Sequence, residues 1–115
     1  MNKLNLKKKI LIIIKKFKEN DFNSVIKKSN FLLREIKNND FLWTLQGLSY
    51  LNLNNEVNSI KSFQTAIKIN PKNIDAKNYL GIAYKKINKL KEAEKCFLKC
   101  IEINRNYISS IINLA

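Results

Sequence analysis

Residues 43–50 read WTLQGLSY, and 34 positions later residues 77–84 read KNYLGIAY. The glycine and the tyrosine of the two stretches coincide in this register, and so do Phe63 and Phe97 further along the chain. A fixed period of this length is typical of helical repeats, in which each unit buries its apolar face against the next. The chain is therefore predicted to be a stack of similar units that share one continuous core.

Each period contains two apolar stripes with helical spacing, separated by a polar turn. In residues 40–73 the stripes are Trp43, Gly47, Tyr50 and Leu51, and then Val57, Ile60, Phe63 and Ile67. Asn54 and Asn55 lie between the stripes and are predicted to cap the second helix. Pro71 is predicted to end that helix. The chain of 115 residues has only 2 Gly and 1 Pro, which favours helices over a turn-rich β architecture.

This pattern resembles the tetratricopeptide repeat family, whose signature is Trp-x2-Leu-Gly-x2-Tyr, then Ala-x3-Phe, then Pro. Residues 40–73 match it at Trp43, Gly47, Tyr50, Phe63 and Pro71, and depart from it at Gln46 and Ser59. Residues 74–107 match it at Leu80, Gly81, Tyr84, Ala93 and Phe97, and depart from it at Lys77 and Arg105. The resemblance implies an all-α fold in which antiparallel helical hairpins stack as a right-handed α-solenoid.

The whole chain, residues 1–115, is predicted to form a single domain of this kind. Its parts are a degenerate repeat at 6–39, repeats at 40–73 and 74–107, and the first helix of an incomplete repeat at 108–115. Terminal repeats are often atypical because one of their faces meets solvent. The apolar segment 108–115, with Ala115 in the glycine position, lacks a partner helix, so we expect the sequence to continue beyond it. The alternative is that this segment packs on the third hairpin as a minimal cap.

The small residues of the repeat are predicted to allow close packing. A side chain at Gly47 or Gly81 would obstruct the approach of the two helices in a hairpin, and Ser59, Ala66, Ala93 and Cys100 are interpreted in the same way. Cys96 and Cys100 lie four residues apart in a predicted helix, where a disulfide is geometrically poor and no further ligands complete a zinc site. We interpret both as packing residues.

The composition indicates a non-catalytic protein. There is no His, so the usual general base and the commonest metal ligand are missing, and we expect no catalytic residue, metal or cofactor. The net charge is +13, and residues 1–39 carry 11 basic and 3 acidic residues. Binding to nucleic acid or an anionic membrane is a less favoured alternative, because compositional bias alone produces a chain rich in Lys, Asn and Ile. The apolar run 10–14 is too short for a signal peptide or a membrane span, which favours a cytoplasmic location.

The resemblance implies that the first helices of successive hairpins line a concave groove. The predicted groove residues are Leu11, Ile14 and Phe17 in the first unit, Leu45, Leu48 and Asn52 in the second, and Tyr79, Ile82, Lys85 and Lys86 in the third. For Leu45 and Ile82 the alternative is packing against a neighbouring helix. Some members of the family hold a C-terminal carboxylate with Lys, Asn and Arg, but those positions hold Ile10, Ile14, Leu45, Asp75 and Tyr79 here. Only Asn113 stands on the row that carries an asparagine ladder in other members.

The predicted function is therefore that of a protein–protein interaction scaffold, which binds a peptide or a partner helix in a largely apolar groove with a basic end. One alternative is that the chain is the N-terminal region of a larger enzyme such as a glycosyltransferase or sulfotransferase. The apolar C-terminal end is a further candidate surface, for self-association.

Overall fold

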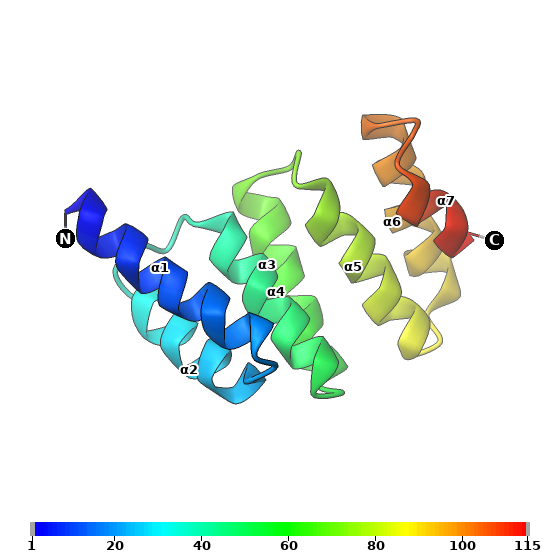
Figure 1. The fold of residues 1–115 in the computed structure, drawn as a ribbon. Coiled ribbons are helices and arrows are strands. Elements are labelled where there is room, and N and C mark those ends of the chain that lie inside the picture. Colours follow the sequence, from blue (N-terminus) through cyan, green and yellow to red (C-terminus); the bar gives the residue numbers. More distant parts are fainter. Residues whose placement is uncertain (1, 115) are drawn as a thin grey trace.

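The computed structural model describes residues 2–114, and over this range it contains seven α-helices and no strand. The helices are α1 (Lys3–Lys18), α2 (Phe22–Leu33), α3 (Asp40–Asn52), α4 (Glu56–Ile69), α5 (Ile74–Lys86), α6 (Leu90–Ile103) and α7 (Ile108–Leu114). They form an elongated stack of 42 × 26 × 21 Å, and helices α1 and α7 lie at opposite ends of it (Figure 1).

The stack is built from three antiparallel hairpins, α1 with α2, α3 with α4 and α5 with α6. The second helix of each hairpin also packs on the first helix of the next one, so that α2 contacts α3, α4 contacts α5 and α6 contacts α7. The first helices contact one another in the order α1, α3, α5 and α7. This arrangement confirms the predicted all-α fold of stacked helical hairpins.

An asparagine in the left-handed conformation sets the turn inside each hairpin. These residues are Asn20, Asn54 and Asn88, with φ of 59°, 59° and 64°, and they are spaced 34 residues apart. Asparagine tolerates this conformation better than most residues other than glycine. At all three turns the next backbone N–H donates to the carbonyl five residues earlier, over 2.9 Å. The first hairpin therefore follows the same period as the other two, although its helices carry little of the repeat signature.

The two asparagines of the second turn have different roles. Asn55 caps α4, because its side chain accepts a hydrogen bond of 3.2 Å from the backbone N–H of Asn58. Asn54 does not cap the helix, and the prediction for this residue was wrong. Its left-handed backbone ends the preceding helix instead.

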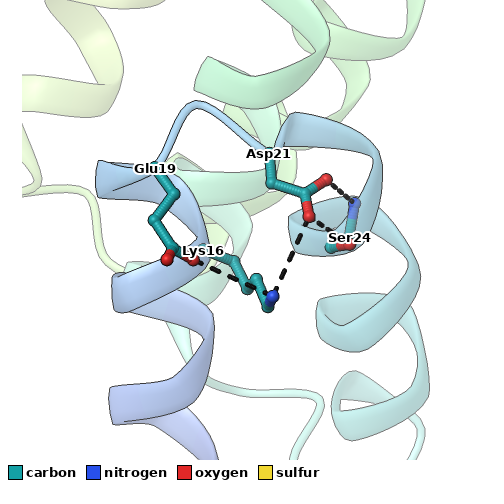
Figure 2. Close-up of polar contacts among 4 residues, drawn as sticks. All are labelled: Lys16, Glu19, Asp21 and Ser24. Carbon is teal, nitrogen blue, oxygen red and sulfur yellow. Dashed lines mark hydrogen bonds and ion pairs between the residues drawn. The ribbon is translucent and has the colours of Figure 1, made fainter.

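Polar contacts around the first turn hold α2 at its N-terminus (Figure 2). Asp21 accepts hydrogen bonds from the Ser24 hydroxyl over 2.8 Å and from the Ser24 amide over 3.2 Å. These two bonds, with the nearby Lys16, lower the pKa of Asp21 below its ordinary value of 3.8. The Lys16 ammonium lies between Glu19 and Asp21, at 3.8 and 4.0 Å from their carboxylate oxygens. Such exposed ion pairs contribute little to stability, so the cap of Asp21 is the main contact here.

Glycine allows the helices of the second and third hairpins to approach closely, as predicted. A Cβ atom added at Gly47 would lie 2.5 Å from the ring of Phe63, and one added at Gly81 would lie 2.5 Å from the ring of Phe97. Both phenylalanines are fully buried. The glycine of each first helix therefore makes room for the aromatic ring of its partner helix.

Gln46 stands where the repeat signature has leucine, and the structure explains the departure. Its side chain is 2% exposed and lies between α2 and α4. The amide nitrogen donates to Ser29 Oγ over 3.0 Å and to Asn30 Oδ1 over 2.7 Å, and the amide oxygen accepts from Ser62 Oγ over 3.1 Å. A buried polar group costs little when all its hydrogen bonds are made. Gln46 thus joins the first hairpin to the second.

Polar contacts also attach α7 to α5. Ser110 is fully buried, and its hydroxyl donates to Asn78 Oδ1 over 2.9 Å, while the Asn113 amide donates to the same oxygen over 3.0 Å. The Tyr107 hydroxyl donates to Asp75 over 2.6 Å, and burial together with this contact raises the pKa of Tyr107. The large apolar side chains that α7 leaves exposed are Ile108, Ile111 and Ile112. Ala115, predicted to take the glycine position of this unit, lies outside the described residues.

The two cysteines pack inside the third hairpin. Cys100 is fully buried, and its thiol donates to the Ile74 carbonyl over 3.5 Å. Burial raises the pKa of Cys100, and it raises the pKa of Cys96 to about 11. A thiol in this state is a poor nucleophile and a poor metal ligand at neutral pH. Both residues are free thiols, as their interpretation as packing residues requires.

Candidate peptide-binding groove

The first helices of the three hairpins lie next to one another, and we call one side of them the first-helix face. Residues at positions i, i+4, i+7 and i+11 of a helix lie on the same side. On this face α1 contributes Lys7, Leu11, Ile14 and Lys18, α3 contributes Phe41, Leu45, Leu48 and Asn52, and α5 contributes Asp75, Tyr79, Ile82 and Lys86. Because α1 contacts α3 and α3 contacts α5, these three rows lie next to one another.

Most of the predicted groove residues are exposed or half-buried, so a ligand can contact them. Leu11 is 52% exposed, and the other exposed members are Asn52, Lys85 and Lys86. The half-buried members are Ile14, Phe17, Leu48, Tyr79 and Ile82.

Leu45 is different, because it is only 7% exposed and belongs to the core cluster around Ile13 and Leu42. The structure therefore places Leu45 in packing between helices, the alternative use foreseen for it, and it adds little to the surface.

The prediction omitted Phe41, which lies in the first turn of α3. Its side chain is 47% exposed, a large fraction for an aromatic residue. Phe41 precedes Leu48 by seven residues, a spacing that places both on one side of the helix. The sequence contained this signal, and Phe41 belongs to the first-helix face.

Half-buried side chains of the first-helix face pack against the hydrophobic core beneath them. Leu48, Tyr79 and Ile82 pack against the core cluster that contains Phe63. The Tyr79 ring stacks on the Phe63 ring, with centroids 6.1 Å apart and an interplanar angle of 23°. Side chains fixed in this way lose little conformational entropy when a ligand covers them. These side chains of the first-helix face are therefore preorganised.

One end of the first-helix face is basic. Lys15, Lys16 and Lys18 lie in the last turn of α1, and Lys85 and Lys86 lie in the last turn of α5. Cations at these places also complement the helix dipoles. The Lys85 ammonium donates to the carbonyl of Asn113 in α7 over 3.3 Å, whereas Lys86 is exposed. This end suits an acidic part of a ligand.

The positions that could form a carboxylate clamp carry other chemistry here. Ile10 and Ile14 are half-buried hydrocarbon side chains, and Leu45 is in the core. Tyr79 is stacked on Phe63, and the Asp75 carboxylate accepts the hydrogen bond from Tyr107. These five side chains do not supply a set of donors that converge on a carboxylate.

Within residues 2–114 there is no group of three or more His, Cys, Asp or Glu side chains that could hold a metal ion. None of the helices described there is long and apolar enough to cross a membrane.

Known proteins resemble this chain in sequence and in fold. A TPR repeat-containing protein of Methanocaldococcus jannaschii is 31% identical over 71 residues, which are 62% of this chain and 12% of that protein. The chain therefore spans about one eighth of the length of this curated relative.

Solved structures match over nearly the whole chain. The structure of MamA aligns with a TM-score of 0.91 and 17% identity over 96% of this chain and 64% of that one. The first TPR of Spaghetti (RPAP3), bound to an HSP90 peptide, aligns with a TM-score of 0.87 and 22% identity, over 93% and 88% of the two chains. The second TPR domain of human RPAP3, in complex with an HSP70 peptide, gives 0.88 and 19%, over 92% and 88%. At these identities the likeness shows the fold.

Family models identify the repeats directly. A tetratricopeptide repeat model matches residues 42–73, and another matches residues 74–107. Together they cover more than half of the chain and coincide with the hairpins α3–α4 and α5–α6. The chain belongs to the tetratricopeptide repeat family.

Proposed function

We propose that this domain is a protein-interaction scaffold, and that it binds an extended peptide or a partner helix on the first-helix face. The observation that carries the proposal is the row of partly exposed apolar side chains along three adjacent helices, which includes Leu11, Phe41, Leu48 and Ile82. Contiguous exposed apolar surface of this kind marks interaction sites in soluble proteins. Structures of the same fold that hold peptides support this use of the scaffold.

The ligand has a defined chemistry. The apolar side chains of the first-helix face are expected to bind apolar side chains of the ligand, spaced so that they reach α1, α3 and α5 in turn. Acidic residues of the ligand meet Lys86 and Lys18 at the basic end. A free C-terminal carboxylate is not required, because the clamp positions hold Ile10, Ile14, Leu45, Asp75 and Tyr79. A peptide ending in EEVD is therefore expected to bind no better than the same peptide with an amidated C-terminus.

The test begins with selection of peptides from a displayed random library on the intact protein. Calorimetric titration then compares the selected peptide on the native protein with Leu11→Arg and Phe41→Arg. These side chains are 52% and 47% exposed, so an arginine there can be accommodated at the surface. The matched control is Leu98→Arg, because Leu98 is 46% exposed and lies on α6, outside the first-helix face.

We expect each groove variant to weaken binding by about tenfold or more, which corresponds to about 1.4 kcal/mol. The control should bind as the native protein does, and all four proteins should have the same helical circular dichroism. A selected peptide that Leu98→Arg weakens and both groove variants leave unchanged would contradict the proposal.

A further inference from the structure

The N-terminal end of the stack has an open hollow between α1 and α2. Its volume is about 670 Å³. Ile12 and Phe31 form apolar parts of its wall, and the cationic residues that line it are Lys9, Lys27, Lys28 and Arg34. This surface lies apart from the first-helix face, because α2 supplies most of its lining.

The repeat itself shows what such a surface accommodates. A shift of 34 residues places Ile12 on Gln46 and Lys28 on Ser62. In the second hairpin Gln46 and Ser62 are 2% and 3% exposed, and Gln46 bonds to two side chains of α2. In the first hairpin Ile12 is 50% exposed, and Lys28 is exposed too. The hollow therefore corresponds to the surface of the second hairpin on which α2 packs.

The chemistry of the hollow differs from that of its equivalent. Phe31 is 62% exposed, and the Arg34 guanidinium lies 5.9 Å from the centroid of its ring. The residue 34 positions after Phe31 is Thr65, so the equivalent position in α4 is not aromatic. Among residues 2–114, no acidic side chain lines the hollow. Aromatic and arginine side chains together are typical of the residues that contribute most to binding at interfaces.

We propose that this hollow binds an amphipathic acidic helix of a partner protein, in the position that α2 occupies on the second hairpin. Large apolar side chains of the helix cover Ile12 and Phe31. Its carboxylates pair with Lys9, Lys27, Lys28 and Arg34. The site is a second interaction surface, independent of the first-helix face.

Charge separates this occupant from a second copy of the chain. Each copy carries +13, and the apolar face of α7 belongs to a segment without any charged residue. That face has no carboxylate that could pair with Lys9, Lys27, Lys28 or Arg34. A polyanion would meet the cations but would leave Ile12 and Phe31 uncovered, so the exposed aromatic ring favours a protein helix.

The experiment uses fluorescence anisotropy with a labelled synthetic helix as the probe. The probe carries Leu at positions i, i+3, i+4 and i+7 and Glu on its other faces. A control probe has the same composition in shuffled order. The protein variants are Phe31→Ser and Lys27→Glu. Their matched controls on α4 are Val57→Ser, at a site 64% exposed, and Lys61→Glu, at the position 34 residues after Lys27.

We expect saturable binding of the amphipathic probe, with at least about a fivefold loss for Phe31→Ser and for Lys27→Glu. Val57→Ser, Lys61→Glu and the groove variant Leu11→Arg should stay within about twofold of the native protein, and the shuffled probe should bind weakly. An equal loss with Leu11→Arg would overturn the proposal, because the probe would then occupy the first-helix face.

Three further results would also overturn it. The first is that the amphipathic probe shows no saturable binding, or that the shuffled probe binds as tightly as the amphipathic one. The second is displacement of the probe by polyuridine RNA together with indifference to Phe31→Ser, which would identify a polyanion surface. The third is a dimer in light scattering that Phe31→Ser converts to a monomer, which would identify a second copy as the occupant.

Discussion

Replacement of Gly81 by alanine tests whether close packing of the hairpin sets the choice of glycine. The added Cβ would lie 2.5, 2.8 and 2.9 Å from three ring carbons of Phe97. Carbon atoms in good contact are about 3.5 Å apart or more, so the ring would have to move by about 1 Å. Phe97 is 2% exposed, and in a close-packed protein interior such a movement requires the neighbouring side chains to repack.

Two effects of opposite sign decide the result. Alanine in place of glycine stabilises the interior of a helix by about 0.8–1.0 kcal/mol. Forcing an extra methyl group into a packed core costs about 1–3 kcal/mol. We therefore expect Gly81→Ala to lower the free energy of unfolding by about 1 kcal/mol, measured by urea denaturation with circular dichroism.

A double-mutant cycle isolates the steric contribution. In a Phe97→Leu background the clashing ring is gone, and Gly81→Ala should then raise stability toward the full gain of about 1 kcal/mol. The coupling between the two changes should amount to about 1–2 kcal/mol. A stabilisation of about 1 kcal/mol by Gly81→Ala in the native background would refute the steric explanation, because helix propensity alone would then account for the result.

Four other changes have defined outcomes. Asn88→Ala should lower the free energy of unfolding by about 1 kcal/mol and Asn88→Gly should not, because the backbone there has φ 64°; urea denaturation measures both, and equal effects would argue against a conformational cause. Gln46→Leu should cost about 1–3 kcal/mol by leaving the Ser62 hydroxyl without its acceptor, and adding Ser62→Ala should recover part of that loss; no recovery would mean that shape rather than hydrogen bonding is responsible. Cys96, with a pKa raised to about 11 by burial, should react with a disulfide reagent at pH 8 far more slowly in the folded protein than in urea, and equal rates would contradict its burial. The lowered pKa of Asp21 contributes stability that is present above the ordinary pKa of 3.8 and is lost as the pH falls through the folded-state pKa. Asp21→Asn should therefore unfold more easily than the native protein at neutral pH and should approach its stability in acid, as urea denaturation at several pH values would show. A difference in stability that grows in acid would contradict the lowered pKa.

The period in the sequence predicted the fold because every unit repeats the same local solution. Gly47 and Gly81 recur with the rings that they accommodate. The close approach of the helices at both glycines was expected, whereas the contacts with Phe63 and Phe97 were seen only in the structure. The turns were only partly predicted, since Asn54 and Asn55 are chemically alike but take different positions relative to the helix ends. The same period relates Asn20 to Asn54 and Asn88, and it indicates that the degenerate first unit shares the hairpin geometry of the other two.

The groove was harder to predict, because exposure depends on contacts that are distant in sequence. Leu45 and Leu48 look equivalent on one helix, but only Leu45 is enclosed by the cluster around Ile13. Phe41 could have been found from its spacing to Leu48. The role of Gln46 could not have been found, since its hydrogen-bond partners lie on α2 and α4, 16 or 17 residues away in the sequence. The hollow between α1 and α2 likewise exists only where the two helices meet.

Amide chemical-shift mapping of a selected peptide on isotope-labelled protein tests most directly whether the first-helix face binds a partner. We predict that the perturbed amides will gather on α1, α3 and α5, around Leu11, Phe41, Leu48 and Ile82, and that α4 and α6 will be little affected. Perturbations confined to α4 and α6, or spread evenly over the stack, would contradict the proposed groove.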